Sequence, residues 1–176
     1  MIRKKVTFIG LGVMGYPMAG HLKKNNIEVT VYNRTSSKSD KWVSEYGGFS
    51  ESTPGKASQN SEIIFICVGK DSDLREVMEG EEGILKNVRE NTIIVDHTTA
   101  SANIAREYFE ICKNHNLHFL DAPVSGGQAG AENGKLSTPV KTLALVPFAP
   151  VVKEYSPPVR DISSFIPLYP GSSRFK

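Results

Sequence analysis

Near its amino terminus the chain reads VTFIGLGVMG over residues 6–15. The first four residues of this stretch are β-branched or aromatic, which favours a strand, and the glycines that follow indicate a tight turn. After the turn, Met14, Met18 and Leu22 recur every fourth residue, so they would share one face of a helix. A strand, a glycine turn and a helix in this order predict the first unit of a βαβ fold.

The same alternation of strand and helix patterns continues to residue 137. Further strands are predicted over residues 29–32, 63–68, 92–96 and 117–120, and helices over 36–46, 71–79 and 102–114. Residues 63–68 (IIFICV) are continuously apolar, which is typical of a central strand buried on both faces. Thr53 and Pro54 are typical of the cap and the first residue of one more helix. We therefore predict an α/β fold of the Rossmann type, a doubly wound, mostly parallel sheet with helices on both faces.

Composition narrows the class of protein. The 176 residues leave room for one ordinary domain, and a hydrophobic fraction of 39% is enough to bury a core. The near balance of 21 Lys and Arg against 19 Asp and Glu argues against a basic nucleic-acid-binding protein. No apolar run approaches the roughly 20 residues of a membrane helix, and the amino terminus lacks the pattern of a signal peptide. We expect a cytoplasmic protein with no nucleic-acid or membrane partner, and the histidine spacing predicts no metal site.

The composition changes after residue 137. Seven of the ten prolines lie within residues 138–176, and proline at this density removes backbone donors and blocks helix interiors. We therefore predict two regions, a folded domain over residues 1–137 and an irregular, proline-rich C-terminal tail over residues 138–176.

The glycine turn has the spacing G-x-G-x-x-G. Gly10 would permit the tight turn, Gly12 lacks the Cβ that would block a pyrophosphate, and Gly15 would let helix and strand pack closely. Backbone N–H groups and the positive end of the helix would then bind the anion. The turn predicts a dinucleotide site, and a tight turn without a ligand is the alternative. The predicted cofactor-binding residues of the turn are Gly10, Leu11, Gly12, Val13, Met14 and Gly15.

The end of the second predicted strand carries Asn33, Arg34 and Thr35, with Lys38 close behind. NAD-binding sheets usually place a carboxylate here to bond the ribose 2′-hydroxyl. We expect no carboxylate at this point to repel a 2′-phosphate, and a guanidinium can bind one by two parallel hydrogen bonds. The prediction is that these four residues select NADP over NAD, unless Arg34 is an ordinary exposed charge.

A second glycine-rich segment follows the last predicted strand. Residues 121–127 read DAPVSGG, in which successive N–H groups of Ser125, Gly126 and Gly127 could form an anion-binding nest. Such a nest would suit the carboxylate of a small substrate, although a glycine-rich loop without a ligand is equally compatible with the sequence.

Together these segments resemble the β-hydroxyacid dehydrogenase family. Residues 8–19 (FIGLGVMGYPMA) are similar to its amino-terminal signature, and residues 96–99 (DHTT) to its Asp-x-Ser/Thr-Thr strand end. Residues 121–127 resemble its substrate-binding segment, and the likeness extends over about residues 4–137. The Asn-Arg-Thr variant at residues 33–35 is similar to the NADP-using branch, the glyoxylate and succinic semialdehyde reductases.

The resemblance implies hydride transfer between NADP(H) and a small hydroxy acid or its oxo or semialdehyde form, of the 3-hydroxyisobutyrate, glyoxylate or succinic semialdehyde type. It also implies that Val68, Gly69 and Thr98 lie at the nicotinamide end of the cofactor, that Ser125, Gly126 and Gly127 hold the substrate carboxylate, and that the protein is a homo-oligomer. In the family, a lysine from a separate helical domain acts as general acid or base.

The sequence departs from the family after Ser137. Residues 138–176 contain no G-x-G-x-x-x-K-x-x-x-N pattern, so we expect this chain to lack the catalytic lysine and the helical domain. The change suggests a reading frame lost near residue 137 or a shortened gene. Two hypotheses follow, an NADP-dependent oxidoreductase domain and a non-catalytic, dinucleotide-binding remnant of a truncated or frameshifted gene.

Overall fold

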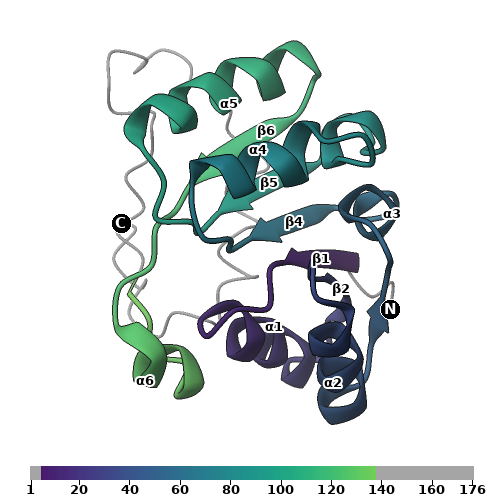
Figure 1. Ribbon diagram of the computed structural model, residues 1–176, viewed down its shortest axis with the longest axis vertical. Coiled ribbons are helices and arrows are strands. Elements are labelled where there is room, and N and C mark those ends of the chain that lie inside the picture. The colour runs from purple at the N-terminus through teal and green to yellow at the C-terminus, as the bar shows by residue number, and fades with distance from the viewer. Residues whose placement is uncertain (1–4, 138–176) are drawn as a thin grey trace.

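The computed structural model describes residues 5–137, which form one six-stranded sheet (Figure 1). The strand order is β3-β2-β1-β4-β5-β6, and every neighbouring pair is parallel. The predicted doubly wound Rossmann-type sheet is thereby confirmed, with all of its strands parallel rather than most of them. The strands are β1 (Lys5–Ile9), β2 (Glu28–Tyr32), β3 (Phe49–Ser50), β4 (Ile63–Ile66), β5 (Ile93–Asp96) and β6 (His118–Asp121).

Helices cover both faces of the sheet. Figure 1 shows α1, α2 and α6 on one face and α4 and α5 on the other. The helices are α1 (Gly15–Lys24), α2 (Ser36–Tyr46), α3 (Pro54–Ser58), α4 (Asp71–Glu79), α5 (Ala102–Asn114) and α6 (Gly127–Glu132), with a 3₁₀ turn η1 (Ile84–Lys86).

The central strand β4 divides the core into two layers. Its Ile63 and Phe65 pack in a cluster that includes side chains of α1 and α2. Ile64 and Ile66 point to the opposite face and pack in a cluster with side chains of α4 and α5. All four are buried, as the continuous apolar run predicts, because successive side chains of a strand alternate between faces.

Capping side chains mark the starts of helices α3 and α5. Thr53 Oγ1 accepts a hydrogen bond from the Lys56 N–H at 3.2 Å, which caps α3 as predicted. Ser101 Oγ caps α5 in the same way, at 3.3 Å from the Ile104 N–H. These bonds satisfy backbone donors that a helix start otherwise leaves without a partner.

The structure also departs from the predicted boundaries. Strand β4 ends at Ile66 instead of residue 68, because the chain turns there towards α4. The short strand β3, the turn η1 and helix α6 were not predicted, since two to six residues are too few for a periodic pattern. The predictions for residues 138–176 lie outside the described residues.

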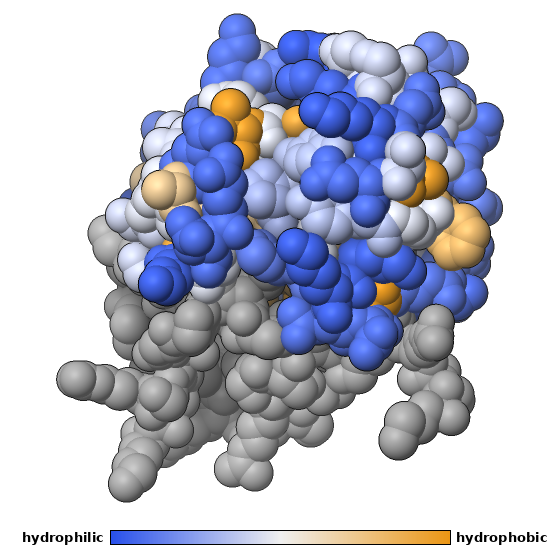
Figure 2. All heavy atoms as spheres, turned by 90° about the horizontal axis from the view of Figure 1, so that it is seen from below, coloured by the Kyte–Doolittle hydropathy of each residue, from blue (hydrophilic) through white to orange (hydrophobic). Residues whose placement is uncertain are grey.

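The face of the molecule seen in Figure 2 is largely hydrophilic where the residues are described. On the face seen in Figure 2, hydrophobic residues are scattered and form no single patch. Within residues 5–137, Val13 and Phe49 are the large hydrophobic side chains classed as exposed, at 62% and 58%. In the same part of the chain no helix combines the length and the apolar character that crossing a membrane would require.

Candidate dinucleotide-binding site

The ends of β1, β2 and β4 border one open cavity of about 330 Å³. The chain winds from β1 towards β2 on one side and returns to β4 on the other, which leaves a crevice at the carboxyl edge of the sheet. The structure brings all the predicted cofactor residues to this cavity except Leu11 and Thr98. The lining residues are Ile9, Gly10, Gly12, Val13, Met14, Gly15, Tyr32, Asn33, Arg34, Thr35, Lys38, Cys67, Val68, Gly69, Asp73, Glu76 and Val77.

The three glycines of the turn differ in what surrounds them. Gly10 has a φ of +95°, and a Cβ there would collide with the carbonyl of Cys67. A Cβ on Gly15 would collide with the carbonyl oxygen of Gly10. At Gly12 no heavy atom lies within 4 Å of the Cβ position, although the residue borders the cavity. Gly10 and Gly15 are therefore required by the packing of the chain, whereas Gly12 leaves open space next to the cavity.

Asn33 ties the glycine turn to the end of β2. Its Oδ1 accepts a hydrogen bond from the Leu11 N–H at 2.9 Å, and its Nδ2 donates to the Thr35 carbonyl at 3.0 Å. The Leu11 side chain is buried in the core. Leu11 therefore supports the turn from beneath, and the bond to Asn33 could not be foreseen from residues 22 positions apart.

Arg34 has two carboxylate neighbours. Its Nη1 lies 3.3 Å from Oδ1 of Asp73 and 3.6 Å from Oε2 of Glu76, both on α4. The expectation that no carboxylate stands here to repel a 2′-phosphate is therefore wrong. The sequence at the end of β2 contains no acid, but the sheet order brings α4 to the same edge, where Asp73 lies 39 residues further along the chain than Arg34.

The loop after β4 is tied to the end of β5. The Val68 N–H donates to Oγ1 of Thr98 at 3.2 Å, and the Thr98 N–H donates to Oδ1 of Asp96 at 2.9 Å. Thr98 is buried, so it acts on the cavity through Val68, which lines it with Gly69.

Asp96 and His97 are titratable groups buried beside this loop. Burial raises the pKa of Asp96 to about 7 against the opposing effect of the Thr98 bonds, and nearby Asp121 raises it further. Burial lowers the pKa of His97 to about 4, and its Nδ1–H donates to the Ala122 carbonyl at 2.7 Å. In the folded protein Asp96 is therefore mostly neutral below about pH 7, and His97 is mostly neutral above about pH 4.

The segment predicted to hold a substrate carboxylate follows β6. Ser125 forms an antiparallel bridge with Ser137, and its N–H donates to the Ser137 carbonyl at 2.8 Å. Gly126 and Gly127 have φ angles of +130° and +61°, a conformation that favours glycine. Because the Ser125 N–H is engaged, a nest could use the N–H groups of Gly126 and Gly127 but not all three.

Over residues 5–137 no group of three or more His, Cys, Asp or Glu side chains is placed to hold a metal ion.

Comparison with known proteins agrees with this arrangement. Residues 5–141 match the family described as the NAD binding domain of 6-phosphogluconate dehydrogenase. An uncharacterized oxidoreductase of Shewanella frigidimarina is 59% identical over 133 residues, which are 76% of this chain and 46% of that protein. A probable 3-hydroxyisobutyrate dehydrogenase-like protein of Arabidopsis thaliana is 40% identical over 134 residues, 76% of this chain and 40% of the relative.

A solved structure of a related protein has a similar fold. The 3-hydroxyisobutyrate dehydrogenase of Mycobacterium tuberculosis with L-serine is 25% identical and superposes with a TM-score of 0.72, over 78% of this chain and 46% of that one. The chain spans about half the length of the curated relatives it matches. It therefore belongs to the family of the NAD binding domain of 6-phosphogluconate dehydrogenase, and its relatives include the β-hydroxyacid dehydrogenases that its motifs resemble.

Proposed function

We propose that residues 5–137 bind NADP as the cofactor-binding domain of an oxidoreductase acting on a small hydroxy acid or its oxo or semialdehyde form. The observation that carries the proposal is the open space at Gly12 beside a cavity lined by the glycine turn. A pyrophosphate needs such close access to backbone N–H groups, and the helix α1 begins at Gly15, directly after the turn.

The choice of NADP rests on the end of β2. Arg34, Thr35 and Lys38 line the cavity together and offer two positive charges and a hydroxyl to a 2′-phosphate. The carboxylates of Asp73 and Glu76 oppose this preference without replacing it, because neither extends from the β2 end where NAD-selective sheets carry their acid.

The substrate assignment rests on the segment after β6. Gly126 and Gly127 are exposed and could present their N–H groups to a carboxylate. The relative from Mycobacterium tuberculosis is described with L-serine, a small molecule that carries a carboxylate and a hydroxyl group. We propose 3-hydroxyisobutyrate, glyoxylate and succinic semialdehyde as the first compounds to test.

Bound NADP(H) would supply the hydride, and this domain would bind and orient the cofactor. The hydrogen bonds from Val68 to Thr98 and from Thr98 to Asp96 would hold the cavity wall beside Gly69. None of residues 5–137 is assigned the proton transfer, and residues 138–176 contain no G-x-G-x-x-x-K-x-x-x-N pattern. We therefore propose that the chain binds the cofactor without turning over substrate.

The test is a calorimetric titration of the purified chain with NADPH and NADH, followed by assays with the three compounds. NADPH is expected to bind more tightly than NADH, with no turnover. Arg34→Gln should weaken NADPH binding by about tenfold and leave NADH binding nearly unchanged.

Arg89→Gln is the matched control. Arg89 is exposed and precedes β5, so it removes the same charge at the amino edge of the sheet, away from the cavity. An absence of binding by either cofactor would overturn the proposed function. Turnover by the chain would show that one of its own residues transfers the proton, and the proposed lack of turnover would be wrong.

A further inference from the structure

Arg34, the cation predicted to bind the 2′-phosphate, already has two carboxylate partners. The Arg34 side chain is 74% exposed, and its guanidinium faces Asp73 and Glu76 at ion-pair distance. The side chain of Asp73 is 23% exposed and that of Glu76 is 64% exposed, so Asp73 is the more shielded partner. All three residues line the dinucleotide cavity. A 2′-phosphate that reaches Arg34 therefore meets two carboxylates at the same place.

Asp73 is held between two walls of the cavity. Its Oδ1 faces Arg34, while its Oδ2 packs against Gly69, where a Cβ would lie 2.8 Å from that oxygen. The Asp73 N–H donates to the Lys70 carbonyl at 3.0 Å in the first turn of α4. The carboxylate thus contacts both the loop after β4, at Gly69, and the segment after β2, at Arg34.

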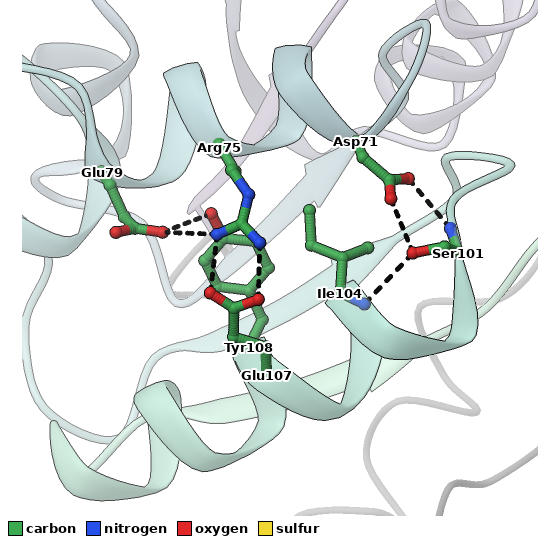
Figure 3. Close-up of polar contacts among 7 residues, drawn as sticks. All are labelled: Asp71, Arg75, Glu79, Ser101, Ile104, Glu107 and Tyr108. Carbon is green, nitrogen blue, oxygen red and sulfur yellow. Dashed lines mark hydrogen bonds and ion pairs between the residues drawn. The ribbon is translucent and has the colours of Figure 1, made fainter.

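The opposite side of α4 is fastened to α5, as Figure 3 shows. Arg75 donates two hydrogen bonds of 2.6 Å to the carboxylate of Glu107. Asp71 accepts hydrogen bonds from the N–H and the hydroxyl of Ser101, at 2.9 and 2.6 Å. These bonds join α4 to α5 on the side of α4 that faces away from Arg34.

We propose that Asp73, assisted by Glu76, is a specificity-determining residue that lowers the preference of this site for NADP over NAD by pairing with Arg34. The inference rests on the proposed function, because it assigns the selectivity of the same site. A 2′-phosphate carries close to two negative charges at neutral pH, and to bind Arg34 it must displace the Asp73 carboxylate from the guanidinium. A ribose 2′-hydroxyl is uncharged, does not need Arg34 and avoids this cost.

The experiment compares dissociation constants for NADPH and NADH in the wild-type chain, Asp73→Asn and Glu76→Gln. Asp73→Asn should raise the selectivity for NADPH by about three- to tenfold, and Glu76→Gln by a smaller factor. Glu62→Gln is the matched control, because Glu62 is exposed and precedes β4 at the opposite edge of the sheet. Its selectivity should stay within about twofold of the wild type.

Repeating Asp73→Asn in an Arg34→Gln background tests the route of the effect. If Asp73 acts by pairing with Arg34, its substitution should then change the selectivity by less than about twofold. An undiminished gain would mean that Asp73 repels the phosphate directly, and the pairing proposal would fail. Wild-type selectivity in both single variants would overturn the inference while leaving NADP binding intact. Binding of neither cofactor to any of the proteins would overturn the proposed function as well.

Discussion

Arg34 at the end of β2 and Asp96 at the end of β5 both lie at the carboxyl edge of one sheet, in opposite surroundings. The Arg34 side chain is 74% exposed and its ion pairs are long, at 3.3 and 3.6 Å. Asp96 is 1% exposed and accepts the Thr98 N–H at 2.9 Å. An exposed ion pair can exchange one partner for a ligand, whereas a buried group is fixed by the hydrogen bonds that compensate its burial.

Because of this difference, we expect some residues at this edge of the sheet to determine cofactor affinity and others to determine the stability of the fold. Substitutions that reach only the open side of the cavity should change cofactor affinity and leave unfolding unchanged. Substitutions among the buried groups should change the free energy of unfolding or its pH dependence.

The largest effect is expected within the glycine turn itself. Gly10→Ala should lower the free energy of unfolding by about 3 kcal/mol or more, because a side chain is strained at its φ and its Cβ would collide with the Cys67 carbonyl. Gly12→Ala should leave stability within about 0.5 kcal/mol of the wild type, since nothing lies within 4 Å of its Cβ position.

For Gly12→Ala the expected change is in cofactor affinity and not in stability. Gly12→Ala should weaken NADPH binding by about 100-fold, because its methyl group would occupy the approach of the pyrophosphate. Urea unfolding and calorimetric titration of the two variants measure both effects. A Gly12→Ala protein that binds NADPH as tightly as the wild type would contradict the placement of the pyrophosphate over this turn.

The next effect concerns the pH dependence of stability that arises from the buried Asp96 and His97 at the end of β5. Between about pH 4 and 7 the unfolded chain has lost the Asp96 proton that the folded chain keeps, so Asp96 makes stability fall as pH rises. Between about pH 4 and 6.5 the unfolded chain protonates His97 and the folded chain does not, so His97 makes stability rise with pH. In the wild type the two contributions oppose each other in this window.

Single substitutions should expose each contribution. From about pH 4.5 to 6, Asp96→Asn should make the slope of unfolding free energy against pH more positive than in the wild type, by about 1.4 kcal/mol per pH unit. His97→Asn should make it more negative by a similar amount. Urea unfolding at several pH values measures the slopes, and acids with lowered pKa values elsewhere are common to all three proteins. Unchanged slopes in both variants would show that these groups are not held neutral.

The sequence predicted this molecule best where the signal is local. Thr53 and Pro54 predict the start of α3, and the apolar run from Ile63 predicts the strand that is buried on both faces. The bounds of α5, Ala102–Asn114, agree with the predicted range because its apolar period is long and its cap is a serine. Capping and periodicity act between neighbours in the chain, so a single sequence contains them.

The remaining features depend on groups that only the fold brings together. Arg34 and Asp73 are 39 residues apart, and neither residue type by itself indicates a partner. The burial of Asp96 likewise depends on β6 lying beside β5, which brings the polar strand ends together. The residues bordering the cavity could thus be predicted largely from motifs, whereas the electrostatic balance within it could not.

The smallest effect is expected at Arg75, which joins α4 to α5 through Glu107. Arg75→Gln would remove the two hydrogen bonds from the guanidinium to the Glu107 carboxylate seen in Figure 3, while the hydrogen bonds between Asp71 and Ser101 remain. Because the pair is exposed, we expect the melting temperature to fall by less than about 5 °C and the difference to shrink at high salt. If α4 also stays in place, the ratio of NADPH to NADH affinity should change by less than about twofold. A larger change in that ratio, measured by titration, would show that selectivity at the exposed Arg34 depends on packing behind α4, and the separation between binding and stability would then be incomplete.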